Sequence, residues 1–142
     1  MTQVQPQTET KPPGATRLYQ IWHGAGGVKC TVGLADPDEL PYELPHAGSY
    51  REYEYGYGGG GPAHLALSIL ADYFEEKLLD GPALYIGGWY NDEADSDEDW
   101  FRESLAVHHH HAFKERFIAP ARPHEPLLIR GEQIAEWLEG QS

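Results

Sequence analysis

The stretch Tyr55-Gly56-Tyr57-Gly58-Gly59-Gly60-Gly61-Pro62-Ala63-His64-Leu65-Ala66-Leu67 decides the fold, because it joins a glycine-rich turn to the best-signalled helix of the chain. Proline suits the first turn of a helix, where its missing N–H group costs no hydrogen bond. Apolar residues then follow at helical spacing over a wide sector. We therefore expect a largely buried helix that ends at Gly81-Pro82.

Two explanations of the glycine turn stay open. The first is steric: positive φ angles, or backbone passing too close to a neighbour for any Cβ atom. The second is an anion site, because N–H groups at a helix N-terminus point outward beside the positive end of the helix dipole. The turn would then hold a small anionic or nucleotide-like ligand. The ligand-binding residues of this second hypothesis are Tyr55, Tyr57, Gly58, Gly59, Gly60, Gly61 and His64.

The same glycines also suggest a dinucleotide-binding fold, a hypothesis that the surrounding residues do not support. Gly56, Gly58 and Gly61 match the Gly-x-Gly-x-x-Gly spacing of such turns. A dinucleotide-binding motif needs an acidic residue about 20 positions after the glycines to bind the ribose. The acidic residues near that position, Glu75 and Glu76, fall inside the expected helix. A Walker-type phosphate-binding loop would need Gly-Lys-Ser/Thr after the glycines, and this chain has none there. These departures argue against both nucleotide-binding motifs.

The segments around the turn predict the rest of the fold. Residues 1–16, rich in Gln, Thr and Pro at their start, are expected to form a disordered tail before a single domain over residues 17–140. Residues 18–32 read as strand, glycine turn, strand. Later segments predict a strand at Leu84–Ile86, a second long helix at Ser96–Ala119, a short strand at Leu127–Ile129 and a last helix at Glu132–Glu139. The predicted class is α+β: a small antiparallel sheet packed against two longer helices and a short C-terminal helix.

Composition limits the partners of the protein. The 142 residues suit one domain, and 23 acidic against 10 basic side chains give a formal net charge of −13. Such a surface repels nucleic acid and anionic lipid, so we expect no direct nucleic-acid binding, and no stretch is apolar enough to span a membrane. The single cysteine, Cys30, fits a reducing compartment, which predicts a cytoplasmic location.

The glycine core resembles that of an uncharacterised family, the domain of unknown function 6166, whose pattern is aromatic-Gly-Tyr-Gly-Gly-Ser-Gly-Pro-Ala-Gln-Leu-Ala-Leu. In this chain Gly60 stands at the Ser position and His64 at the Gln position. Ala112-Phe113-Lys114 and Ile134–Leu138 are similar to later elements of the family, so the resemblance covers residues 19–139. Members occur in bacteria, archaea and their viruses without an assigned activity. The resemblance thus implies a domain boundary and supplies no reaction.

Residues 91–99 form an acidic loop that predicts contact with a basic partner. A calcium loop of the EF-hand type is excluded, because Trp100 stands at its glycine position and Ala106 at its bidentate glutamate position. The carboxylates instead suit docking on the basic surface of a protein, with an aromatic anchor beside them. The partner-binding candidates are Asp95, Asp97, Glu98, Asp99 and Trp100.

The run His108–His111 lies in the second predicted long helix. Helical spacing makes His109 the partly buried member, whereas His108, His111 and Glu115 share an arc of about 60° from which they could hold zinc or nickel. Adventitious metal binding is the simpler alternative. No cofactor is otherwise expected.

No arrangement for nucleophilic catalysis is recognisable, because no serine lies in an elbow motif and Cys30 lies in an expected strand. The hypothesis for function is a non-enzymatic binding or interaction module. Its alternatives are a binder of a small anionic ligand at the glycine turn, and an acidic viral inhibitor of a host nucleic-acid-handling or defence protein.

Overall fold

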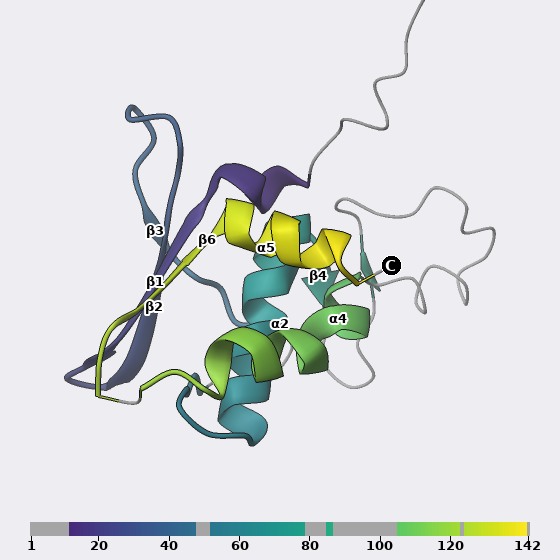
Figure 1. Cartoon of the computed structure of the whole chain (residues 1–142). Helices are drawn as coiled ribbons and strands as arrows, with labels where there is room; N and C mark the ends of the chain where they lie inside the picture. Colours follow the sequence, from purple (N-terminus) through teal and green to yellow (C-terminus); the bar gives the residue numbers. More distant parts are fainter. Residues whose placement is uncertain (1–11, 48–51, 79–84, 87–104, 123, 142) are drawn as a thin grey trace, which may run out of the picture.

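The computed structural model describes residues 12–47, 52–78, 85–86, 105–122 and 124–141. Within these ranges a four-stranded antiparallel sheet carries the helices on one face, which confirms the predicted α+β class (Figure 1). The elements in chain order are η1 (Pro13–Thr16), β1 (Leu18–Gly24), β2 (Gly27–Gly33), β3 (Tyr42–Glu43), α2 (Gly60–Phe74), β4 (Lys77–Leu78), β5 (Tyr85–Ile86), α4 (Leu105–Phe113), η2 (Lys114–Ile118), β6 (Leu127–Arg130) and α5 (Gly131–Glu139).

The sheet has the strand order β3-β2-β1-β6. The predicted hairpin is confirmed: β1 and β2 pair along their whole length around a two-residue turn, with Ile21 opposite Cys30. The predicted strand at 127–129 is confirmed as β6, which pairs with β1 so that Tyr19 faces Ile129. Successive strand residues point to opposite faces, so one set of side chains from each strand enters the core.

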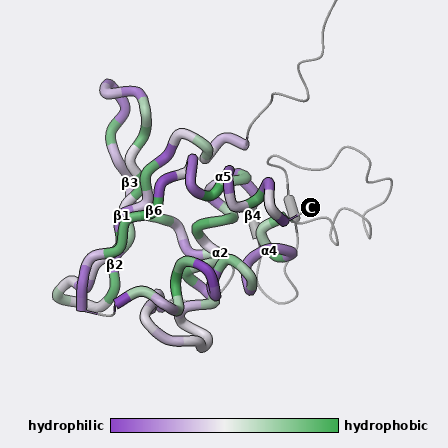
Figure 2. Tube along the Cα trace, viewed as in Figure 1, coloured by the Kyte–Doolittle hydropathy of each residue, from purple (hydrophilic) through white to green (hydrophobic). Residues whose placement is uncertain are grey.

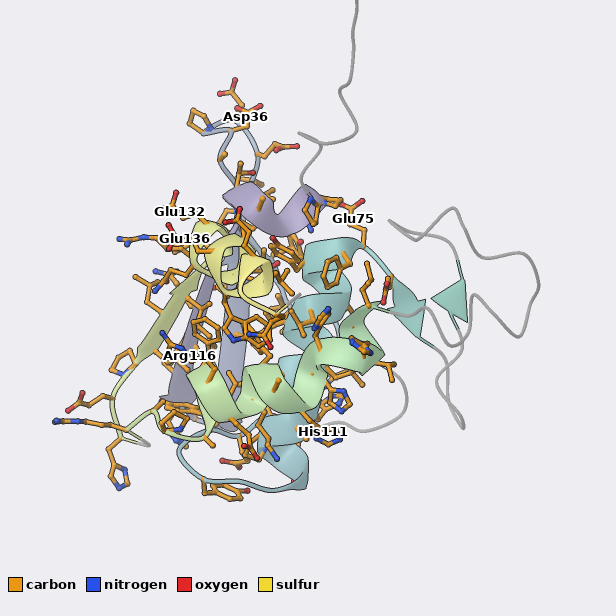
Figure 3. The ribbon with its side chains drawn as sticks, turned by 45° about the vertical axis from the view of Figure 1, so that its right-hand side comes forward. Asp36, Glu75, His111, Arg116, Glu132 and Glu136 are labelled. Atoms are coloured by element: carbon orange, nitrogen blue, oxygen red, sulfur yellow. The ribbon has the colours of Figure 1, made fainter. Side chains whose placement is uncertain are left out.

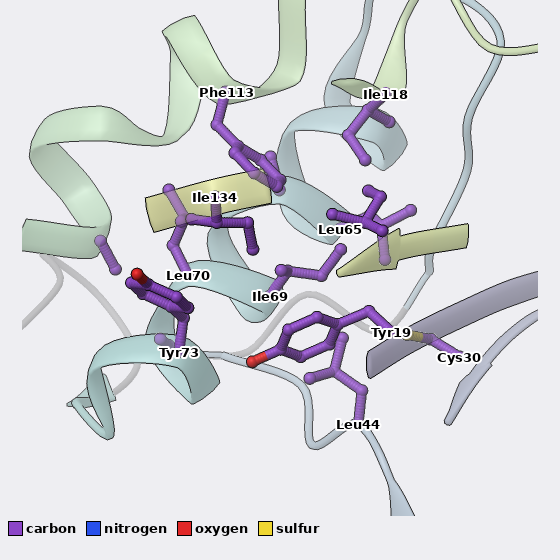
Figure 4. Close-up of a cluster of buried hydrophobic side chains, with 14 of the residues drawn as sticks. Tyr19, Cys30, Leu44, Leu65, Ile69, Leu70, Tyr73, Phe113, Ile118 and Ile134 are labelled. Carbon is purple, nitrogen blue, oxygen red and sulfur yellow. The ribbon is translucent and has the colours of Figure 1, made fainter. Parts of the chain in front are cut away.

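The core lies between this inner face of the sheet and the helices. Hydrophobic residues follow the strands and α2, whereas α5 alternates hydrophilic and hydrophobic positions (Figure 2). The fully buried side chains include Tyr19, Ile21, Leu65, Ile69, Leu70, Tyr73, Phe113, Ile118 and Ile134 (Figure 4). The predicted last helix is confirmed as α5, which places Ile134 in this core. Among the described residues, no helix has both the length and the apolarity needed to cross a bilayer.

Helix α2 ends earlier than the sequence predicts. It stops at Phe74, and Glu75 takes a left-handed conformation with φ 55° that closes the C-terminus by bonding to the Ala71 and Asp72 carbonyls. The prediction of Gly81-Pro82 as the end was therefore wrong. Helices commonly end on a left-handed residue that is usually glycine, and a glutamate there gives no comparable sequence signal.

The carboxylate of Glu76 binds the first described turn of α4. Glu76 is 6% exposed and accepts hydrogen bonds from the N–H groups of Leu105 at 2.9 Å and Ala106 at 3.1 Å. These N–H groups belong to the first turn of α4, where a negative charge is favourable. The capping pair predicted at Ser96 and Asp99 lies outside the described residues. The predicted stop before Pro120 is confirmed, although the last turn, η2, is a wider π turn.

The prediction of a disordered tail over residues 1–16 is wrong for its last four residues. Pro13–Thr16 is a 3-10 helix with Gly14 and Ala15 buried. A Cβ atom on Gly14 would lie 2.4 Å from Tyr73 Cα, and one on Gly131 would lie 2.0 Å from the Gly14 carbonyl oxygen. Two glycines thus let η1 fit between α2 and α5, a close approach that composition cannot reveal.

Replacing Gly131 by alanine tests this crossing. We expect G131A to lose about 1–3 kcal/mol of unfolding free energy or more, because the new methyl group meets backbone that cannot move aside. The matched control is G140A, where the nearest atom to a Cβ is 3.5 Å away and φ is −83°. Chemical denaturation measures both, and equal stability of the two variants would contradict a tight crossing.

Candidate functional site

A polar network centred on Asp72 connects α2 to the sheet. The side chain of Asp72 is only 8% exposed, and its Oδ1 atom accepts hydrogen bonds from Tyr19 Oη at 2.7 Å and Arg17 Nη1 at 3.0 Å. Its Oδ2 atom accepts a hydrogen bond from the Tyr42 hydroxyl. Arg17 also donates to the Asp72 main-chain carbonyl at 2.8 Å and forms an ion pair with Glu75. We call Arg17, Tyr19, Tyr42 and Asp72 the Asp72 network.

The network holds its phenols in the neutral form. Burial, together with the adjacent Asp72 carboxylate, raises the pKa values of both Tyr19 and Tyr42 above the usual range. Burial also raises the pKa of the Cys30 thiol, with a smaller contribution from Asp72. The phenols therefore serve as hydrogen-bond donors, and the nucleophilic thiolate of Cys30 is disfavoured.

Two cavities flank the chain between β3 and α2, and His46 lines both. The larger cavity, of about 430 Å³, lies on the Asp72 network and is also lined by Ser68, Glu75 and Glu76. The smaller cavity, of about 330 Å³, lies between β2 and residues 52–54. Both volumes fall within or near the range of small-ligand sites.

His46 belongs to a stack of three aromatic rings, with His64 and Tyr53. His46 Nδ1 lies 2.8 Å from His64 Nε2, with the two rings parallel to within 8°. Tyr53 stacks on His46 at a centroid distance of 4.2 Å and donates its hydroxyl to the Leu44 carbonyl at 2.8 Å. The next residue, Ala47, donates its N–H to Ser68 Oγ at 3.0 Å. The chain after β3 is thus held by side chains of α2.

The charges of the smaller cavity are predominantly acidic. Glu43, Glu52 and Glu54 line it together with Lys29. None of these three carboxylates forms a salt bridge or side-chain hydrogen bond with a described residue. In the larger cavity, by contrast, Asp72 and Glu75 bind Arg17, and Glu76 caps α4. The smaller cavity therefore holds the carboxylates that remain available to a ligand.

The residues of the predicted anion site do not converge on an open site. Tyr55 is 1% exposed and donates its hydroxyl to the Glu125 carbonyl at 2.8 Å, and His64 is buried against His46. Tyr57 is 50% exposed. Gly58 and Gly59 precede α2, and Gly60 and Gly61 are its first two residues. The structure therefore brings His64 to a different site from the exposed part of the turn.

The side chain of Glu54 lies against the start of α2. A Cβ atom on Gly61 would be 2.6 Å from Glu54 Cγ, whereas one on Gly58 would meet no atom within 4 Å. Burial, with the nearby charge of Glu54, raises the pKa of Tyr55. A carboxylate at this helix terminus opposes a second anion. The close contact also supports the steric explanation at Gly61.

The predicted metal ligands are not assembled. No three His, Cys, Asp or Glu side chains form a possible metal site within the described ranges, which contain His108, His111 and Glu115. The wide π turn begins at Lys114, so the regular helical spacing behind the prediction ends before Glu115. His111 lies on the outside of α4 (Figure 3). His109 is half-buried as predicted, with its ring edge on Trp137, and burial lowers its pKa.

The acidic-loop candidates lie outside the described residues. This applies to Asp95, Asp97, Glu98, Asp99 and Trp100. Docking through that loop stays a prediction.

The sequence analysis missed the polar stripe of α2. His64, Ser68 and Asp72 occur at every fourth position of an otherwise apolar helix, so they share one face. That face is the one that meets His46, Ala47 and the Asp72 network. Polar residues at this spacing inside a buried helix were a signal that could have identified the site.

Comparisons with known proteins add no relative: no family model matches the chain, and neither the curated proteins nor the solved structures give a significant match.

The Asp72 network can be tested with two tyrosine variants that remove the same atom. Y19F should lose about 1.5–3 kcal/mol, because the hydroxyl donates to a charged acceptor. The Tyr73 hydroxyl is buried and has no hydrogen-bond partner among the described residues, so Y73F should be neutral or more stable. Urea unfolding measures both variants, and equal losses would contradict a stabilising role for the Tyr19 bond.

The steric explanation of the glycine turn makes a separate prediction. G61A should lower unfolding free energy by about 1–3 kcal/mol, because its methyl group overlaps Glu54. G58A should leave stability unchanged or raise it slightly, since the position has room. Thermal denaturation of the two variants compares them. Full stability of G61A would show that Gly61 is not required by packing.

Proposed function

We propose that this protein is a non-enzymatic binding module that holds a positively charged segment of a partner in the smaller cavity. The observation that supports this proposal is a group of three carboxylates around a cavity of about 330 Å³, Glu43, Glu52 and Glu54, which form no salt bridge or side-chain hydrogen bond with another described residue. Guanidinium and ammonium groups form strong charge-assisted hydrogen bonds with carboxylates. A basic side chain therefore complements this cavity.

The charge of the whole chain favours the same class of ligand. A formal net charge of −13 attracts cations and speeds their association over distances set by the salt concentration. Among the described residues that line the cavity, the cationic side chain is Lys29, whose Nζ atom lies 3.7 Å from the position of a Cβ on Gly26. Lys29 thus extends toward the hairpin turn, and the carboxylates outnumber it.

The backbone that carries the three carboxylates is held by packing and strand pairing, which supports binding without large rearrangement. Glu52 and Glu54 flank Tyr53, which is 6% exposed and stacked on His46. Glu43 is fixed by the pairing of β3 with β2 opposite Thr31. Groups placed on such supported backbone lose little conformational entropy when a ligand arrives.

An anionic ligand at the glycine turn is less well supported. Glu54 lies against the first turn of α2, and Pro62 removes one N–H donor there. The same carboxylate that opposes an anion contributes to the proposed site for a cation.

The proposal predicts a site-specific loss of binding in E43Q/E52Q/E54Q. We expect its dissociation constant for a fluorescent hexa-arginine peptide to rise about tenfold or more, as expected when charge-assisted hydrogen bonds are lost. The measurement is fluorescence anisotropy at low salt and at about 0.3 M NaCl, where long-range attraction is screened.

The matched control is E115Q/E132Q/E136Q, which removes the same charge from exposed positions; Glu132 and Glu136 lie on the outer side of α5 (Figure 3). The control should bind within about threefold of the unmodified protein, because only the distant field changes. Equal weakening of both triple variants, or binding that disappears entirely at the higher salt, would show attraction to net charge alone and refute the site.

A further inference from the structure

Strand β2 is paired on its outer side over only part of its length. β3 pairs with Thr31 and Val32, and the Leu44 N–H donates to the Cys30 carbonyl at 2.9 Å. Beyond Cys30 the described chain adds no further pair on that side. Among the described residues, the outer edge of β2 is therefore unpaired from Lys29 back to the hairpin turn.

The direction of the open hydrogen-bonding groups follows from strand geometry. The Cys30 carbonyl points to the β3 side, and the N–H and C=O groups of alternate residues point to the same side. The N–H and C=O of Val28 consequently point away from β1 and toward the line of β3. Val28 and Lys29 both line the smaller cavity.

The chain after β3 leaves the edge of β2 because side chains of α2 bind it. In the register of β3, His46 would lie opposite Val28. Instead, His46 bonds to His64 and Ala47 bonds to Ser68, so both residues are drawn to α2. Val28 instead lines the smaller cavity, which Glu52 and Glu54 also line.

We propose that an extended basic segment of a partner protein adds to the edge of β2 beside Val28, in line with β3. This inference rests on the proposed function and specifies how the ligand is held. Main-chain groups of the segment bond to the Val28 N–H and C=O, as in other cases of strand addition to an exposed edge. A basic side chain of the same segment reaches Glu43, Glu52 or Glu54.

Charge selects the occupant of this edge. The three carboxylates have no partner among the described residues, and they stand beside an edge whose backbone groups have none either. A segment with basic residues satisfies both sets of groups at once. Exposed strand edges attract other chains, and the carboxylates restrict this one to basic sequences.

The experiment uses a short peptide of alternating arginine and valine in three forms. One form is unmodified, and the other two carry N-methyl groups on alternate amides, either the odd or the even set. Because the two sets point to opposite edges of an extended chain, strand addition predicts that only one methylated peptide binds weakly. We expect a loss of about fivefold or more in that form, measured by fluorescence anisotropy with the full chain.

Amide hydrogen exchange provides an independent measurement. The Val28 N–H should exchange more slowly when the unmodified peptide is bound, and the amide of Trp137, which lies in α5 and does not line the cavity, serves as the control. If the peptide binds and depends on the three glutamates, but both methylated forms bind equally well and Val28 is not protected, strand addition is refuted while the proposed function stands. If no basic peptide binds, both proposals fail.

Discussion

The structure depends on the burial of one carboxylate, that of Asp72 near the end of α2. A charged group with 8% exposure is tolerated only when its oxygen atoms are bonded, and here the partners come from two strands and the segment before β1. Its position fixes how far α2 extends across the sheet. Arg17 also donates a hydrogen bond to the Asp72 main-chain carbonyl. The same network therefore helps to cap the C-terminus of α2, where Glu75 is the capping residue. Sheet and helix are thereby locked together at one point.

The two cavities flank a second attachment between α2 and the chain after β3. This attachment uses Ser68 and His64, which lie one and two helical turns before Asp72 on the same face of α2. Ser68 and His64 hold Ala47 and His46, which pulls the chain away from the sheet directly after β3. A longer β3 would cover the edge of β2, whereas the described residues leave this edge unpaired beside three glutamates. The polar stripe of α2 therefore shapes the site without contributing most of its charge. Packing of the helix and formation of the cavity are two results of one pattern.

Much of the fold was predictable from local pattern. The β1–β2 hairpin and α5 were predicted from the spacing of their apolar residues, and β6 was predicted from a short apolar run that follows Pro126. The end of α2 was not, since it depends on a glutamate in a left-handed conformation. The order of residues 13–16 was missed because it depends on two glycines, Gly14 and Gly131, that are far apart in sequence. Of the predicted site residues, Glu54's neighbour Tyr55 proved to be core, and His64 proved to be paired with a histidine that the sequence analysis had not considered.

The sequence by itself determined the class of the fold, the acidic charge and the absence of an intramolecular disulfide, because composition and short-range periodicity carry that information. It also marked the glycine turn as special. Only the tertiary structure decided why Gly61 is needed there, which carboxylates are already bonded and which remain available. Those properties depend on contacts between residues from β2, β3 and α2, and the energy of a buried polar group is set by the partners that folding brings to it.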